Sequence, residues 1–323
     1  MRPFLAIATA ALTIAAAPGA DPLPSWNDTP TKAAIAEFAE DADVEDSGGF
    51  VPDEQRIAVF DNDGTLWAEQ PYYFQLMFLL DRAKALAAAD PNWADAPALR
   101  AAAAGDLQSL MAGGDKALLE LAGATQSGMS VEAFEREVAN WLETARHPVT
   151  GRLIRDMPSQ PMRELLDLLR ANGFRVYIVS GGGVDFMRAF AQQAYGVSPE
   201  NVIGSFGDAA YGTADGKPAV IKGRAVAFID DKEGKPVGIM RHIGRRPVFV
   251  AGNSDGDYQM AEWSTAGGGP RMAIFIHHTD AAREFAYDRK SPVGALDRAL
   301  DAAASHGWIV VDMQADWNRI WAN

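Results

Sequence analysis

The stretch RIAVFDNDGTLW, residues 56–67, constrains the fold of this chain more than any other. In it an apolar run, Ile57–Phe60, ends at two aspartates one residue apart, Asp61 and Asp63, and Gly64 follows. A short apolar run bounded by glycine is typical of a buried strand. Two carboxylates at the end of such a strand repel each other and resist the loss of water. The stretch therefore predicts a buried strand that opens onto a polar site, and a cation between the carboxylates is one way to offset their repulsion.

Strand and helix patterns alternate along much of the remaining chain. Apolar runs such as FRVYIVS and RMAIFIHH are typical of strands, whereas SQPMRELLDLLRANG has the apolar spacing of a helix, with Ser159 as its expected N-cap. This alternation predicts an α/β fold, a Rossmann-like parallel sheet core with helices on both faces. Further expected elements are a helix at 184–196, a short strand at 200–206, a strand pair within 217–234, a strand within 245–257, a helix at 291–307 and a strand at 308–313.

One long segment interrupts this alternation, because it has helical spacing throughout and no strand pattern. Its expected helices lie at 72–89, 99–113, 116–124 and 131–145. We therefore expect an inserted all-helical domain at 75–147, and an α/β core formed by 55–74 and 148–323. Residues 21–54 are expected to be a linker with one short helix.

Residues 1–20 have the pattern of a secretory signal peptide. One Arg precedes an apolar run, Phe4–Ala17, and small residues follow it. Cleavage is expected between Ala17 and Ala20, with export to the periplasm. The run is too short to span a bilayer comfortably, and no later stretch is long and apolar enough. The chain contains no Cys, which excludes structural disulfides, a lipoprotein anchor and a thiol nucleophile.

The charge balance limits the partners that we expect. The chain has 43 acidic and 29 basic residues, a formal net charge of −14. Because nucleic-acid binding needs a basic surface, this balance argues against a nucleic-acid partner. It also provides no long-range attraction for anions, so a phosphate site must be built locally. Nothing in the sequence indicates a protein partner.

Polar residues follow several of the expected strands, and ligands bind at the carboxyl ends of parallel strands. Ser180 and the three glycines that begin at Gly181 follow one strand, and GNSDGD, residues 252–257, follows another. Carboxylate and amide oxygens from two strands could hold Mg²⁺. Ser180 and the backbone N–H groups after it could hold an anion. Of the adjacent His277 and His278, only one can face the site, since neighbouring strand residues point to opposite faces.

Four short motifs give the chain a resemblance to a known family. VFDNDGT, YIVSGG, a Lys before a later strand, and GNSDGD resemble the four motifs of the haloacid dehalogenase superfamily. The helical segment resembles that superfamily's mobile cap, inserted after the first motif. The β region at about 202–230 resembles the phosphoserine-phosphatase-like branch. The likeness extends over about residues 55–315.

The resemblance implies a role for each matching residue. Asp61 matches the nucleophile, which forms an aspartyl-phosphate. Asp63 matches the general acid and base, and its backbone carbonyl would face the metal. Ser180 and the Gly181 amide match the phosphate clamp. Dehalogenases of this superfamily lack the second aspartate, so Asp63 favours ester hydrolysis over dehalogenation.

Two positions match the family motifs less closely than the aspartates do. We expect Lys235 to be the cation that pairs with the nucleophile and the substrate phosphate, with Lys222 and Lys232 as nearby competitors. In GNSDGD, Asn253 occupies a position where the family usually has an acidic metal ligand. Asn can ligate Mg²⁺ through its carbonyl oxygen but brings no charge, so Asp255 could take over this role. The expected metal residues are Asp61, Asp63, Asn253 and Asp257.

Together these features predict an exported, Mg²⁺-dependent phosphatase that hydrolyses a small phosphorylated metabolite. The main alternative is a binding protein with a weakened active site, which the neutral Asn253 suggests. Another alternative is a phosphotransferase on the same core.

Overall fold

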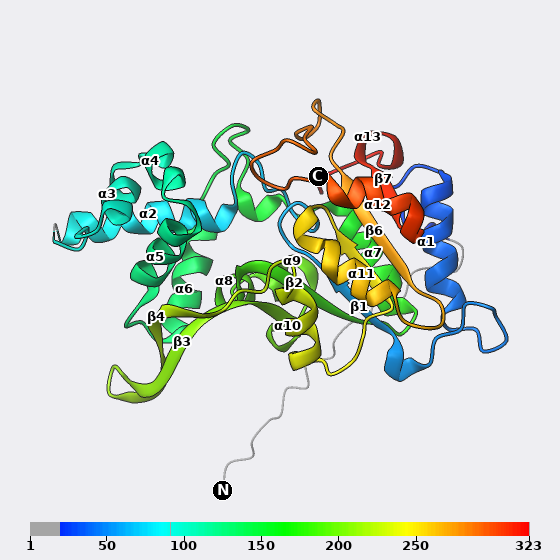
Figure 1. The fold of residues 1–323 in the computed structure, drawn as a ribbon, viewed down its shortest axis with the longest axis horizontal. Coiled ribbons are helices and arrows are strands. Elements are labelled where there is room, and N and C mark those ends of the chain that lie inside the picture. The colour runs from blue at the N-terminus through cyan, green and yellow to red at the C-terminus, as the bar shows by residue number, and fades with distance from the viewer. Residues whose placement is uncertain (1–19, 91, 323) are drawn as a thin grey trace, which may run out of the picture.

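One seven-stranded sheet organises the molecule, with strands in the order β4-β3-β2-β1-β5-β6-β7 (Figure 1). The structure is a computed structural model that describes residues 20–90 and 92–322. Apart from Ala20, the expected signal peptide lies outside the described residues. All neighbouring strands pair in parallel except β3 and β4, so the predicted α/β fold with a parallel sheet is confirmed. The strands are β1 (Ile57–Phe60), β2 (Arg175–Gly183), β3 (Val202–Ala214), β4 (Lys217–Phe228), β5 (Phe249–Gly252), β6 (Met272–His277) and β7 (Ile309–Asp312).

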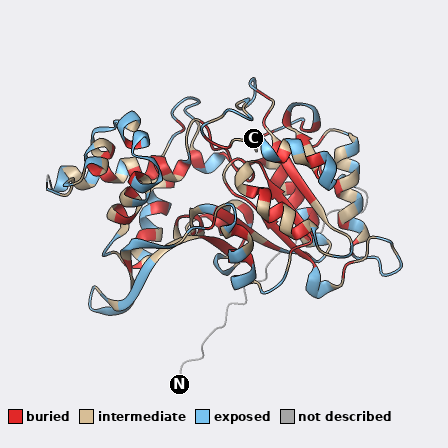
Figure 2. Ribbon diagram, viewed as in Figure 1, coloured by how far each residue is buried: buried red, intermediate tan, exposed pale blue. Residues whose placement is uncertain are grey.

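Alternate residues of the central strand β1 supply two separate cores. Ala58 and Phe60 pack into one hydrophobic cluster, and Ile57 and Val59 pack into another. Because successive strand residues point to opposite faces, the sheet is buried on both sides. Figure 2 shows the sheet as the main buried region. The first cluster includes residues of α1 (Pro30–Asp41) and α7 (Gln160–Ala171), and the second includes residues of α10 (Gly234–His242), α11 (Tyr258–Thr265) and α12 (Arg298–His306).

The helical segment between β1 and β2 forms a group of helices beside the sheet (Figure 1). One helix was expected at 99–113, but the structure has two, because Gly105 ends the first in a left-handed conformation with φ 73°. The helices are α2 (Phe74–Ala89), α3 (Pro97–Ala104), α4 (Leu107–Ala112), α5 (Gly114–Gln126) and α6 (Val131–Leu142).

The prediction of a strand pair within 217–234 is wrong. That segment contains the single strand β4, whose partner is β3, a strand longer than the one expected at 200–206. The turn between them, Asp215–Gly216, has positive φ at both residues, 50° and 74°. Such a turn matches the twist of two antiparallel strands and lets both continue.

Two further expectations differ in detail. The helix expected at 184–196 is divided into two short helices. Ser159 precedes α7 as expected, but its side chain makes no capping hydrogen bond, and its hydroxyl has no partner among the described residues. The remaining short helices are α8 (Val184–Arg188), α9 (Ala191–Tyr195), α13 (Met313–Asp316) and the 3₁₀ turns η1 (Asp53–Gln55), η2 (Ile154–Asp156), η3 (Pro199–Asn201) and η4 (Asp255–Asp257).

The β3–β4 hairpin reaches from the sheet to the helical group. Lys222 of β4 exchanges backbone hydrogen bonds with the loop after α5, donating to Met129 and accepting from Gly128. Gly123 of α5 lies so close to β4 that an added Cβ would be 2.1 Å from the Arg224 carbonyl oxygen. Within the described ranges, no helix has the length and apolar character needed to cross a membrane.

Candidate active site

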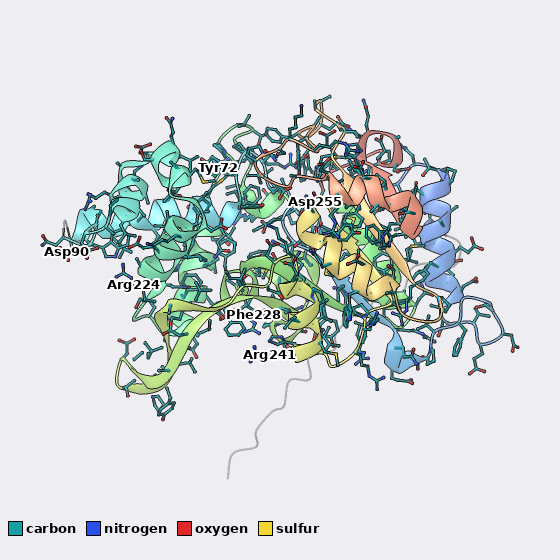
Figure 3. The ribbon with its side chains drawn as sticks, viewed as in Figure 1. Tyr72, Asp90, Arg224, Phe228, Arg241 and Asp255 are labelled. Carbon is teal, nitrogen blue, oxygen red and sulfur yellow. The ribbon has the colours of Figure 1, made fainter. Side chains whose placement is uncertain are left out.

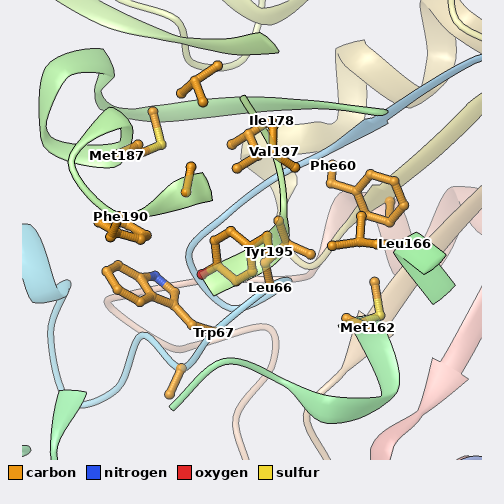
Figure 4. Packing of buried hydrophobic residues seen from close by; sticks show 14 of the residues in the cluster. Phe60, Leu66, Trp67, Met162, Leu166, Ile178, Met187, Phe190, Tyr195 and Val197 are labelled. Carbon is orange, nitrogen blue, oxygen red and sulfur yellow. The ribbon is translucent and has the colours of Figure 1, made fainter. Parts of the chain in front are cut away.

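The end of β1 places the two aspartates beside β5. The Asp61 N–H donates to the Ala251 carbonyl at 2.9 Å, which extends the pairing of β1 with β5 by one residue. The chain then turns, and the Trp67 indole N–H donates to Asp63 Oδ1 at 2.8 Å. Trp67 itself stacks on Phe190 with ring centroids 4.5 Å apart (Figure 4). The orientation of the Asp63 carboxylate therefore depends on a buried aromatic cluster.

A buried ammonium group joins the first and last motifs. Lys235, in the first turn of α10, lies with its Nζ 2.6 Å from Asp61 Oδ1, and it also binds Asp257. The side chains of all three residues are less than a tenth exposed. Of the competitors, Lys222 binds Asp185 and Lys232 is exposed. The structure thus brings Lys235, and neither competitor, to Asp61.

These charges shift each other's proton affinities. Burial and the neighbouring Asp257 carboxylate raise the pKa of Asp61 well above its usual range, against the opposing effect of Lys235. Burial also raises the pKa of Asp63 to about 6. Burial alone would lower the pKa of Lys235, but Asp257 and Asp61 raise it, so this residue is a fixed cation. The site holds more carboxylates than cations.

The residues of GNSDGD have distinct positions. Asp257 is fully buried, and its Oδ2 accepts the backbone N–H groups of Asn253 and Ser254. The Asp255 carboxylate, labelled in Figure 3, accepts three backbone N–H groups at the start of α12, those of residues 297–299. These bonds commit both Asp255 oxygens to the start of α12, and Asp255 does not line the pocket described below. With its bond to Lys235, Asp257 uses both of its oxygens within the protein.

The Asn253 side chain contacts Glu69, an acidic residue that the sequence analysis did not predict to be part of the site. Its Nδ2 donates to Glu69 Oε1 at 2.7 Å, and its Oδ1 accepts from the Thr65 hydroxyl at 3.2 Å. Glu69 is 2% exposed and also accepts from the Tyr287 hydroxyl at 2.8 Å. Burial raises the pKa of Glu69 to about 7. The only signal for it in the sequence is an acidic residue six positions after Asp63, which is equally typical of an exposed loop.

The glycine run at the end of β2 forms another wall of the site. The Ser180 hydroxyl accepts the Gly182 N–H at 3.1 Å, so its own proton is available to an incoming oxygen. Gln75, from the first turn of α2, accepts the Gly183 N–H at 2.8 Å. Thus a side chain of the helical group contacts the loop that was expected to bind phosphate. Gln75 was also missed, since a glutamine in a predicted helix has no distinguishing pattern.

The two adjacent histidines at the end of β6 have different surroundings, as expected. His278 is buried, with Nδ1 2.9 Å from a Glu284 oxygen and Nε2 2.7 Å from the Gly64 carbonyl oxygen. His277 is half-buried near Asp288. His278 therefore holds the turn that follows Asp63, and no acidic side chain of the site is bonded to it directly.

A pocket of about 380 Å³ lies over these residues, between the end of the sheet, the helical group and the hairpin. Its floor includes Asp61, Asp63 and Lys235. The ion pair of Lys222 and Asp185 also lines it. The rest of the wall is largely apolar and includes Leu76, Leu79, Leu118, Leu119, Ala122, Phe134, Val184, Phe186, Phe206, Val226 and Ile229.

The donor atoms at the floor suit a hard divalent cation. Burial and mutual repulsion disfavour the ionised form of Asp61, and a cation would offset both effects. Asp61, the Asp63 carbonyl and Asn253 are the groups that would hold it, and all are oxygen donors. Among residues 20–90 and 92–322, no group of three or more His, Asp or Glu side chains gathers as a ready-made metal site. A cation here would therefore also need amide, backbone or water oxygens.

The family model of haloacid dehalogenase-like hydrolases matches residues 58–262. A conserved protein of unknown function from Anaerococcus prevotii has a similar structure, with 15% identity and a TM-score of 0.53 over 80% of this chain and 88% of its own. A protein of unknown function from Bordetella pertussis has 19% identity and a TM-score of 0.50 over 80% and 99%.

A phosphoserine phosphohydrolase-like protein from Francisella tularensis also matches, with 15% identity and a TM-score of 0.42 over 77% of this chain and 98% of its own. The comparison with curated proteins gave no match. At these identities, the first two structures establish a shared fold and nothing about substrates.

Proposed function

Because the chain belongs to the haloacid dehalogenase-like hydrolase family, we propose that it hydrolyses a small phosphomonoester, with Asp61 as the nucleophile. The observation that carries this proposal is the contact of 2.6 Å between Asp61 and the buried Lys235, on the floor of a pocket that Asp63 also lines. An ammonium group at this place holds the carboxylate in position and attracts a phosphate dianion.

In the first step an Asp61 oxygen attacks phosphorus, and the bond from phosphorus to the leaving alkoxide breaks. Asp63 gives its proton to that alkoxide. In the second step Asp63 takes a proton from water, the water oxygen attacks phosphorus, and the bond to Asp61 breaks, which releases phosphate. Lys235, the Ser180 hydroxyl and the Gly181 N–H hold the phosphate oxygens throughout.

Mg²⁺, when bound by Asp61, the Asp63 carbonyl and Asn253, would neutralise charge on the carboxylate and the phosphate. The apolar wall favours a substrate whose alcohol part has a hydrophobic body, since apolar surface is buried at a gain of about 25 cal/mol per Å². The helical group would act as a cap over that part, with Gln75 as its contact to the phosphate loop.

Replacing Asp61 by Asn tests the proposal, because an amide keeps the shape but is no nucleophile. We expect phosphate release from a panel of monoesters, measured with Mg²⁺, to fall by about 10³-fold or more. Asp46→Asn, at an exposed carboxylate far from the pocket lining, is the matched control and should keep full activity. An Asp61→Asn protein that hydrolyses the best substrate at near wild-type rate would exclude this mechanism.

The same assay separates the alternatives. A binding protein would release no phosphate from any ester, with or without a chelator. A phosphotransferase would release little phosphate from the ester but would pass it to an added alcohol acceptor. A hydrolase should release alcohol and phosphate in equal amounts at all acceptor concentrations.

A further inference from the structure

Glu69 is a buried carboxylate that forms no ion pair with the described residues. Its side chain is 2% exposed, and among the described residues no Lys, Arg or His nitrogen lies within ion-pair distance of it. Its two hydrogen-bond donors, Asn253 Nδ2 and the Tyr287 hydroxyl, are neutral and both contact Oε1. His278 offsets this charge only through space, because its ring stacks on Tyr287 and makes no hydrogen bond to Glu69. Burying a carboxylate with no cation in contact is costly, which indicates that a further charge balances it.

The Glu69 carboxylate lies against the turn that carries the catalytic aspartates. A Cβ added at Gly64 would be 2.5 Å from Glu69 Oε1 and 2.1 Å from Asn253 Nδ2. Glu69 also lines the pocket together with Asp61 and Asp63. Only glycine at position 64 leaves room for the paired carboxylate and amide beside the turn.

Glu69 Oε2 accepts no hydrogen bond from the described residues, whereas Oε1 accepts two. Most buried polar atoms have a hydrogen-bond partner, so a carboxylate oxygen without one calls for an explanation. The free oxygen belongs to a group that lines the pocket, so it is available to a ligand there.

We propose that Glu69 supplies the divalent cation site with the negative charge that Asn253 lacks, and that the Asn253 amide holds Glu69 in place. This inference rests on the proposed function, because it assumes a cation beside Asp61. The negative charge would then come from a residue 184 positions earlier in the chain, whose Oε1 lies 2.7 Å from Asn253 Nδ2. Glu69 would act directly or through a bound water, and Tyr287 would position it.

The affinity of the protein for Mn²⁺ in the absence of substrate tests this inference. The electron paramagnetic resonance signal of the unbound ion measures that affinity. Glu69→Gln should weaken binding by about tenfold or more, as loss of a supporting group does at other metal sites. In the variant Glu69→Gln/Asn253→Asp, the carboxylate returns to position 253, and affinity should recover to near that of the wild type. Glu164→Gln is the matched control, since Glu164 is a buried carboxylate bonded to Ser25 and absent from the pocket lining.

Tyr287→Phe gives an independent measure, because it removes one donor to Glu69 and keeps the ring that stacks on His278. It should weaken Mn²⁺ binding less than Glu69→Gln does. Thermal unfolding of each variant without metal confirms that it is folded. Equal Mn²⁺ affinity of Glu69→Gln and the wild type would overturn the inference but leave the proposed hydrolysis intact, as would a Glu69→Gln variant that changes only KM. A wild-type protein that binds no Mn²⁺ would overturn both the inference and the proposed metal dependence.

Discussion

At the residue scale, this protein pairs buried charges around one short turn. Lys235 binds Asp61 and Asp257, and His278 holds the Gly64 carbonyl. The Asp61 and Asp257 carboxylates share the Lys235 ammonium group, and removing one partner of such a buried pair costs about 3–5 kcal/mol. The turn that presents the aspartates is therefore fixed by an ion pair and a hydrogen bond from segments far away in the chain.

The pair of His278 and Glu284 should make stability depend on pH. Burial opposes a charge on His278, but the nearby Glu284 carboxylate outweighs it and raises the pKa of His278 above 6.5. Since the folded pKa exceeds the unfolded one, the stabilisation is complete below pH 6.5 and is lost as pH rises through the folded pKa. Glu284→Gln should lower the free energy of unfolding by about 1–3 kcal/mol at pH 6, with a smaller loss at pH 9.

Urea unfolding of both proteins at the two pH values measures this effect. Glu45→Gln, at an exposed position, is the control and should change stability little at either pH. If the loss caused by Glu284→Gln is the same at pH 6 and pH 9, His278 is not a titrating partner of Glu284.

At the scale of elements, the contact of α5 with β4 determines where the helical group lies. Gly123→Ala would place a methyl group 2.1 Å from the Arg224 carbonyl oxygen, so helix or strand must shift. Although Ala is the better helix former by about 1 kcal/mol, the backbone clash should outweigh that gain. We expect a net destabilisation of about 1–3 kcal/mol.

Thermal unfolding measures this change, and Gly48→Ala is the matched control because nothing lies within 4 Å of its added Cβ. An increase in the unfolding temperature of Gly123→Ala would show that α5 and β4 are not in tight contact. A variant that is destabilised and also has an altered KM would link this contact to the pocket.

At the scale of the whole molecule, the N-terminal segment packs on the C-terminal end of the chain. Leu23 and Trp26 are buried, Trp26 lies edge-on to Trp317, and Ser25 is bonded to Glu164. Removal of these residues would open the core, so a leader peptide must end before them. We therefore propose that export removes the first 17 to 20 residues and leaves this packing intact.

Mass measurement and N-terminal sequencing of the protein from its native cell test this proposal. The mature chain should begin between Pro18 and Asp21 and should be found outside the cytoplasm. A chain that keeps Met1 and stays in the cytoplasm would refute export.

Local sequence patterns were sufficient to predict much of the fold and part of the candidate site. The apolar run of β1, its aspartates and the alternation of strands and helices predicted the sheet. The spacing of apolar residues along one segment depends on its own secondary structure and on the face that it buries. The sequence of that segment is therefore enough to predict both. The expectation that Lys235 meets Asp61 came from the family resemblance, and the structure brings the two together.

Other features depended on contacts that only the tertiary structure makes. The β3–β4 pairing depends on a two-residue turn and on the strands' mutual register. Asp255 caps a helix 42 residues away, and Glu69 meets Tyr287 at a separation of 218. A polar side chain has the same local pattern whether it lies in solvent or against a distant partner, so its role is decided when the chain folds.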